Sequence, residues 1–76
     1  MTIHPIKAFR SLHGLTLAQF GARIGVEKAA VSKWENDVQP VSVKAAIEIE
    51  AQFGPDLARW KLRPDVWDMP AREAAQ

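Results

Sequence analysis

The feature that most constrains the fold is a very short connection between two helical patterns within residues 16–36. Thr16 and Gln19 fit a capping box, in which Thr16 is the N-cap and the Gln19 side chain returns to the N-cap backbone. Gly25 ends this first helix, because a positive φ costs glycine little. A second helical pattern follows almost at once, so the two helices must approach each other closely. Gly21 permits that approach, because it has no side chain.

The second helix, expected at about residues 27–36, has two chemically different faces. At about 100° per residue, Ala30, Val31 and Trp34 fall on one arc and form its packing side. The opposite arc is mostly polar and consists of Lys28, Ala29, Ser32, Lys33 and Asn36. The sequence therefore predicts a helix that is held by one face and free on the other.

The free face has the chemistry of a DNA-reading surface. An α-helix fits the major groove, where Lys donates to guanine O6 and N7, Ser pairs with several bases, and an Ala methyl contacts thymine. Backbone amides at the helix N-terminus near Thr16 suit a phosphate. A solvated face without a partner is the alternative interpretation of the polar arc. The cap, the small residue and the glycine turn together favour binding to double-stranded DNA.

The remaining pattern predicts an all-α, compact bundle of about five helices in a domain of residues 1–68, with a flexible tail at 69–76. The other expected helices are one from Pro5 to Gly14 with Ile6, Phe9 and Leu12 on one face, one from the Ser42 N-cap to Phe53, and a short one around Leu57–Leu62.

Composition excludes several classes of protein. The chain of 76 residues has no cysteine, which removes disulfides, thiolate zinc sites and cysteine nucleophiles and fits a cytoplasmic location. No apolar run approaches the roughly 20 residues of a membrane span. Residues 1–47 carry six Lys and Arg against three Asp and Glu, whereas residues 48–76 carry four against six. This division suits a DNA face opposite a partner face, although an ordinary mixed surface explains it almost as well.

Candidate catalytic and metal-binding groups are poorly arranged. His4 and His13 flank the first helix at a separation unsuited to one metal ion. Three aspartates near the C-terminus have no supporting pocket in the pattern, and no serine has a base near it in sequence. We expect no enzymatic activity, no metal and no cofactor.

Two tryptophans leave an alternative open. Trp34 belongs to the packing side of its helix, but a domain this small has little interior left for Trp60 and Trp67. These two side chains could cap the core or form a dimer patch, and one side chain could serve both.

Residues 15–36 resemble the helix-turn-helix of the phage Cro and repressor family. The run Val31-Ser32-Lys33-Trp34-Glu35 is similar to the family's frequent Val-Ser-x-Trp-Glu signature. The segment at 62–67, Leu-Arg-Pro-Asp-Val-Trp, looks like the ending of the small Cro-like group of YdaS-type antitoxins. The resemblance covers about residues 5–67 and implies a lambda-repressor-like bundle with the helix at 27–36 in the major groove.

The resemblance also implies roles for individual residues. Positions that face bases in the family are occupied here by Lys28, Ala29, Ser32 and Lys33. Asn36 and the loop to Lys44 match positions that face phosphate. Structural roles fall to Gly21, Gly25, Val31 and Trp34, and to Arg10 and Glu35, which match a salt-bridging pair.

The sequence departs from the family at three positions. Leu17 stands where a DNA-contacting glutamine is frequent, so no contact is carried over there. Gly21 replaces an alanine, which lowers helix propensity by about 1 kcal/mol. Glu27 stands where Ser or Thr often caps the helix; its carboxylate favours the helix dipole but repels phosphate, and it either accepts from cytosine N4 or is only a surface charge.

Together these features predict a Cro-like transcriptional repressor of phage or prophage type. Because a lone domain has few phosphate contacts, we expect a homodimer on a two-fold operator with half-sites roughly 34 Å apart. The alternative is an antitoxin or protein-interaction module that neutralises a partner such as a toxin. The low net charge and the acidic, Trp-containing C-terminal part motivate that alternative.

Overall fold

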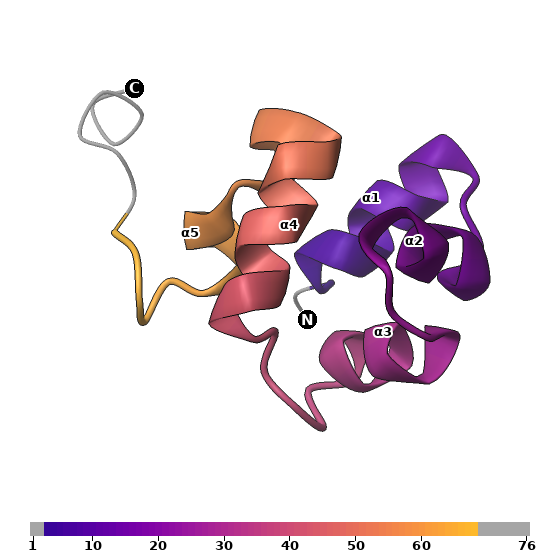
Figure 1. The fold of residues 1–76 in the computed structure, drawn as a ribbon, viewed down its shortest axis with the longest axis horizontal. Helices are drawn as coiled ribbons and strands as arrows, with labels where there is room; N and C mark the ends of the chain where they lie inside the picture. The colour runs from indigo at the N-terminus through magenta and orange to yellow at the C-terminus, as the bar shows by residue number, and fades with distance from the viewer. Residues whose placement is uncertain (1–2, 69–76) are drawn as a thin grey trace.

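A computed structural model describes residues 3–68, and within this range the chain forms helices and no strand (Figure 1). The elements are α1 (Pro5–His13), α2 (Leu17–Ile24), α3 (Lys28–Glu35), α4 (Val43–Phe53), the 3₁₀ helix η1 (Gly54–Leu57) and α5 (Arg59–Leu62). The expected all-α bundle of about five helices is confirmed. The tail predicted at residues 69–76 lies outside the described residues.

Local signals at the helix ends explain where the helices begin. The Thr16 hydroxyl accepts from the Gln19 N–H, while the Gln19 side chain accepts from the Thr16 N–H, so the predicted capping box is present. Ser42 caps α4 by accepting from the Ala45 N–H at 3.1 Å. The cap of α1 was not predicted: the Nδ1 atom of His4 accepts from the Ile6 N–H at 3.2 Å.

The core lies between α4, the first three helices and the segment of η1 and α5. Ile6, Phe20, Val31 and Ile49 are completely buried, and they bring together α1, α2, α3 and α4. The Phe20 ring stacks on Phe53 with centroids 4.7 Å apart. In Figure 1, α4 stands between the α1–α2 pair and α5, while α3 lies at the lower edge of the molecule.

One prediction about an apolar residue was wrong. Leu12 does not share the buried face of α1 with Ile6, and it is 80% exposed. A three-residue spacing falls about 60° short of a full helical turn at each step, so Leu12 has rotated away from the core. The short helix expected around Leu57–Leu62 is present as α5 (Arg59–Leu62), and an extended backbone at Ala58 separates it from η1.

The C-terminal segment is fastened back onto the bundle. Arg63 Nη1 donates to the Val41 carbonyl at 2.8 Å, and the same guanidinium pairs with Asp65 at 2.7 Å. Trp67 packs against the core, with the Arg59 guanidinium 5.4 Å from its ring centre. Trp60 is half-buried and lies outside the core cluster. Of the two tryptophans with an open role, Trp67 covers the core.

Candidate nucleic-acid interface

The turn between α2 and α3 brings the two backbones into close contact. Gly21 is buried, and a Cβ atom added to it would lie 2.5 Å from the Val26 carbonyl oxygen. The Gly21 carbonyl accepts from the Val26 N–H at 2.9 Å, and Gly25 between them has a φ of 76°. A side chain at position 21 therefore has no room unless the turn shifts, and the position of α3 against α2 is closely fixed.

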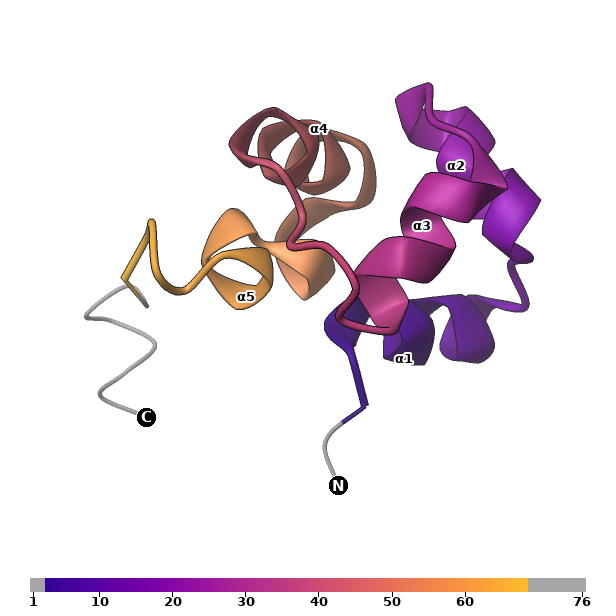
Figure 2. The ribbon, with the colours of Figure 1, turned by 90° about the horizontal axis from the view of Figure 1, so that it is seen from below.

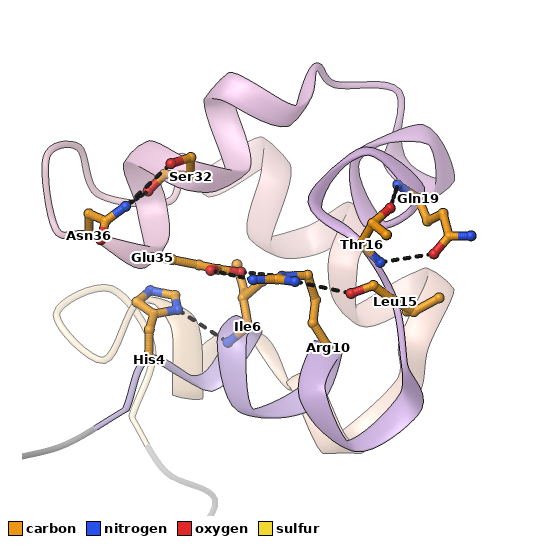
Figure 3. Close-up of polar contacts among 9 residues, drawn as sticks. All are labelled: His4, Ile6, Arg10, Leu15, Thr16, Gln19, Ser32, Glu35 and Asn36. Atoms are coloured by element: carbon orange, nitrogen blue, oxygen red, sulfur yellow. Dashed lines mark hydrogen bonds and ion pairs between the residues drawn. The ribbon is translucent and has the colours of Figure 1, made fainter.

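An ion pair fixes the other end of α3. Arg10 Nε lies 2.6 Å from Glu35 Oε2, and Arg10 Nη2 lies 2.8 Å from Oε1, so the pair is bidentate (Figure 3). Arg10 Nη1 also donates to the Leu15 carbonyl at 3.0 Å. The hydrogen bond to Glu35 raises the pKa of Arg10, and the Arg10 and Glu35 side chains are only 17% and 6% exposed. The pair links α1, the loop before α2 and the last residue of α3, which is a structural role.

The outer face of α3 contains the side chains expected to face bases. Lys28, Ala29 and Lys33 are exposed, and Ser32 is half-buried, whereas Val31 and Trp34 on the inner face are buried. Figure 2 shows α3 from below, facing the viewer in front of α2. One helix thus has an apolar side in the core and a donor-bearing side in solvent.

Asn36 closes the C-terminal end of this face. Its Nδ2 atom donates to the Ser32 carbonyl at 2.8 Å and to the Ser32 hydroxyl at 3.3 Å (Figure 3). The amide is therefore held over the last turn of α3, with Asn36 itself exposed. Its oxygen has no partner among these contacts.

The residues expected to face phosphate lie on three different elements. Thr16 is exposed at the start of α2, but both its hydroxyl and its amide are engaged by Gln19. Because the Gln19 amide donates to that hydroxyl, only the amides of Leu17 and Ala18 are available in the first turn. Lys44 is exposed in the first turn of α4 and lines a depression together with Gly25 and Trp34. The fold thus brings the start of α4 next to the α2–α3 turn.

A shallow apolar groove runs between α2 and the start of α3. Its apolar lining consists of four small side chains, and we call it the alanine groove: Ala18, Ala22, Val26 and Ala29. Glu27 and Lys28 lie on its border. Sequence reasoning missed Ala18 and Ala22, although two alanines four residues apart on α2 were the available signal.

The histidines have other environments than a metal site. His4 caps α1, and burial lowers its pKa from the usual 6.5 against the opposing charges of Asp37 and Glu35. The His13 ring lies 4.2 Å from the Phe9 ring, centroid to centroid. Within residues 3–68, no group of three or more His, Cys, Asp or Glu side chains is placed to hold a metal ion. No helix in this range has the length and apolarity to cross a membrane.

Comparison with known proteins gives one match. A family model described as helix-turn-helix matches residues 6–59, from the first turn of α1 to the start of α5. No curated protein matches the chain, and no solved structure does.

Proposed function

Because the chain belongs to the helix-turn-helix family of DNA-binding regulators, we propose that it binds a specific double-stranded DNA site with α3 in the major groove. We further propose that it acts as a Cro-like repressor of phage or prophage type. The observation that carries the proposal is the division of α3 into a buried inner face and an exposed face with two lysines.

Four side chains of this face contact bases in the proposed complex. Lys28 and Lys33 supply ammonium donors for guanine O6 and N7, Ser32 supplies a hydroxyl that can donate or accept, and Ala29 supplies a methyl. The bidentate pair of Arg10 with Glu35 supports this arrangement, because it restrains α3 without using any group of the outer face. A preoriented helix loses less conformational entropy when it binds.

Three further residues contact the DNA backbone in the proposed complex. The first-turn amides of α2 next to Thr16, the Asn36 side chain and the Lys44 ammonium approach phosphates on the two sides of the groove. These contacts carry no sequence information themselves, but they fix the register of α3 on the duplex.

The proposed operator complex contains two copies of the chain. One domain of this size makes few phosphate contacts, and a second copy on the same duplex doubles them. A two-fold arrangement places the half-sites one helical turn apart, roughly 34 Å. Protection of two such half-sites in hydroxyl-radical footprinting is the expected result.

Alanine substitutions on α3 test the proposal directly. A specific site is first selected from random duplexes, and binding is then measured in gel shifts. Lys28→Ala and Lys33→Ala should each weaken binding about ten-fold or more, because each removes a base contact. The matched control is Lys61→Ala, which removes the same charge from α5. Circular dichroism should show all three variants folded, since the three lysines are exposed.

The same measurement can refute the proposal. If both α3 variants bind the selected site as tightly as the wild type, α3 is not the DNA-reading helix. If selection enriches no sequence at all, the chain is not a sequence-specific regulator.

Exposed apolar residues on α4 support a second candidate function, an antitoxin of YdaS type that neutralises a partner protein. Val43 and Ile47 lie one turn apart, and each is about two-fifths exposed. The double variant Val43→Ser with Ile47→Ser tests this surface: it should abolish neutralisation of a toxin encoded beside this chain while the fold is kept. Unchanged neutralisation would exclude this surface.

A further inference from the structure

The alanine groove borders two residues of opposite charge. Ala18, Ala22, Val26 and Ala29 give it an apolar lining, and Glu27 and Lys28 line it as well. The groove therefore combines an apolar wall, a carboxylate and an ammonium within a few residues at the start of α3. These three chemistries form one corner of the proposed DNA-binding face.

The Glu27 carboxylate has no capping or ion-pairing partner among residues 3–68. Glu27 is the N-cap residue of α3, but its side chain makes no capping hydrogen bond. It is exposed, and among residues 3–68 it has no ion-pair partner within 4.0 Å. A carboxylate accepts hydrogen bonds only, so in a DNA groove it requires a donor on a base and is repelled by phosphate.

In the major groove, cytosine and thymine differ in the group that lies next to C5, the position that carries a methyl in thymine and in 5-methylcytosine. Cytosine presents its N4 amino donor next to C5, and its guanine partner presents the acceptors O6 and N7. Thymine presents an O4 acceptor next to its C5 methyl. A carboxylate beside an apolar groove therefore attracts a cytosine with a methyl at C5 and repels thymine.

Resting on the proposed function, we infer that this corner recognises a 5-methylcytosine·guanine base pair. The 5-methyl group lies in the alanine groove, the cytosine N4 amino group donates to the Glu27 carboxylate, and the Lys28 ammonium donates to guanine O6 and N7. Unmethylated cytosine keeps both polar contacts but leaves the groove empty. Thymine fills the groove but places its O4 acceptor against the carboxylate.

The experiment uses the intact chain and two random duplex libraries, one synthesised with cytosine and one with 5-methylcytosine. Sites selected from both libraries are compared in matched duplexes that carry cytosine, 5-methylcytosine or thymine at one position. At one half-site position, 5-methylcytosine should bind about four-fold more tightly than cytosine, which is what burying one methyl group supplies. Thymine at that position should bind about ten-fold more weakly than 5-methylcytosine.

Two variants separate the contributions of the groove and the carboxylate. Ala22→Ser places a hydroxyl in the groove at an exposed position with no assigned base contact. It should remove the preference for 5-methylcytosine while binding to the cytosine duplex is kept. Glu27→Gln supplies an amide that can also donate, so it should reduce the discrimination against thymine. Asp56→Asn, an exposed carboxylate on η1, is the matched control and should change neither preference.

The outcomes distinguish this inference from the function on which it rests. Specific binding with equal affinity for cytosine and 5-methylcytosine at every position overturns the inference and leaves the proposed function intact. The absence of any selected site in both libraries overturns both. A methyl preference that survives in Ala22→Ser shows that the methyl group lies elsewhere, and this also overturns the assignment to the groove.

Discussion

The α2–α3 unit and the segment from α4 to α5 are held together by different means. In the first, Gly21 touches the Val26 backbone, and the nearly buried carboxylate of Glu35 ends α3. In the second, Glu50 pairs with Arg59 at 2.6 Å, but the two side chains are 30% and 37% exposed. The α2–α3 unit has no room for an added side chain at Gly21, whereas the stability of the segment from α4 to α5 depends mainly on its buried apolar side chains. The tightest backbone packing thus lies next to α3, the helix that is proposed to enter the DNA groove at a fixed angle.

The largest expected loss of stability comes from a substitution in the closely packed α2–α3 unit. Gly21→Leu places a side chain where even a Cβ atom meets the Val26 carbonyl oxygen. Because backbone must move, the free energy of unfolding should fall by about 3 kcal/mol. Urea denaturation measures it, with Ala22→Leu as control, because Ala22 is exposed on the same helix. Equal losses in the two variants would mean that the approach at Gly21 is not limiting.

Removing one carboxylate from each region sharpens the comparison. Glu35→Gln leaves Arg10 in a largely buried position without its charged partner, and it should cost about 2 kcal/mol. Glu50→Gln removes a partner from a pair that water screens, and it should cost less than about 1 kcal/mol. Thermal unfolding of both variants gives the two values. A cost at Glu50 as large as that at Glu35 would contradict the difference between the regions.

Removing a helix cap should cost about the same free energy of unfolding in the two regions. Thr16→Ala and Ser42→Ala each remove one hydroxyl acceptor from an exposed helix start, and each should cost about 1 kcal/mol. Denaturant midpoints at constant slope measure both. A much larger loss at Thr16 would show that its reciprocal box with Gln19 acts as a unit.

The smallest effect concerns pH and the cap of α1. Burial lowers the pKa of His4, and its Nδ1 accepts from the Ile6 N–H only when that nitrogen is unprotonated. A pKa that is lower in the folded than in the unfolded chain gives stability that is complete above the unfolded value of about 6.5 and is lost as the pH falls.

Stability measured between about pH 8 and about pH 5 tests this contribution. The wild type should lose stability toward the acid end more steeply than His4→Asn, because asparagine can cap a helix but does not titrate. The difference should stay below the roughly 1 kcal/mol of a whole cap. Identical pH profiles would show that the cap does not depend on the protonation of His4.

Sequence alone predicted features that depend on a few neighbouring residues. The box at Thr16, the turn at Gly25 and the cap at Ser42 are local patterns, and each has the predicted geometry. Leu12 was misplaced because a spacing of three does not define one side of a helix. Which side is buried depends on the neighbouring elements, and the sequence does not state their positions.

Contacts between distant residues were beyond sequence reasoning. The Arg63 guanidinium reaches the Val41 carbonyl across 22 positions, and no local pattern marks either group. The alanine groove exists only because α2 and the start of α3 lie side by side, so the spacing of Ala18 and Ala22 on α2 does not by itself show that Ala29 joins them. The base contacts assigned to the outer face of α3, and the phosphate contacts assigned to Thr16, Asn36 and Lys44, stay predictions until binding is measured.

The two-sidedness of α3 has an evolutionary consequence. Its attachment uses Val31, Trp34 and Glu35, whereas the residues at positions 28, 29 and 33 are exposed and support no packing. Exchanges at those three positions should therefore leave the melting temperature nearly unchanged. A lineage that carries this scaffold could diverge rapidly in target preference, one outward residue at a time, without passing through unstable intermediates.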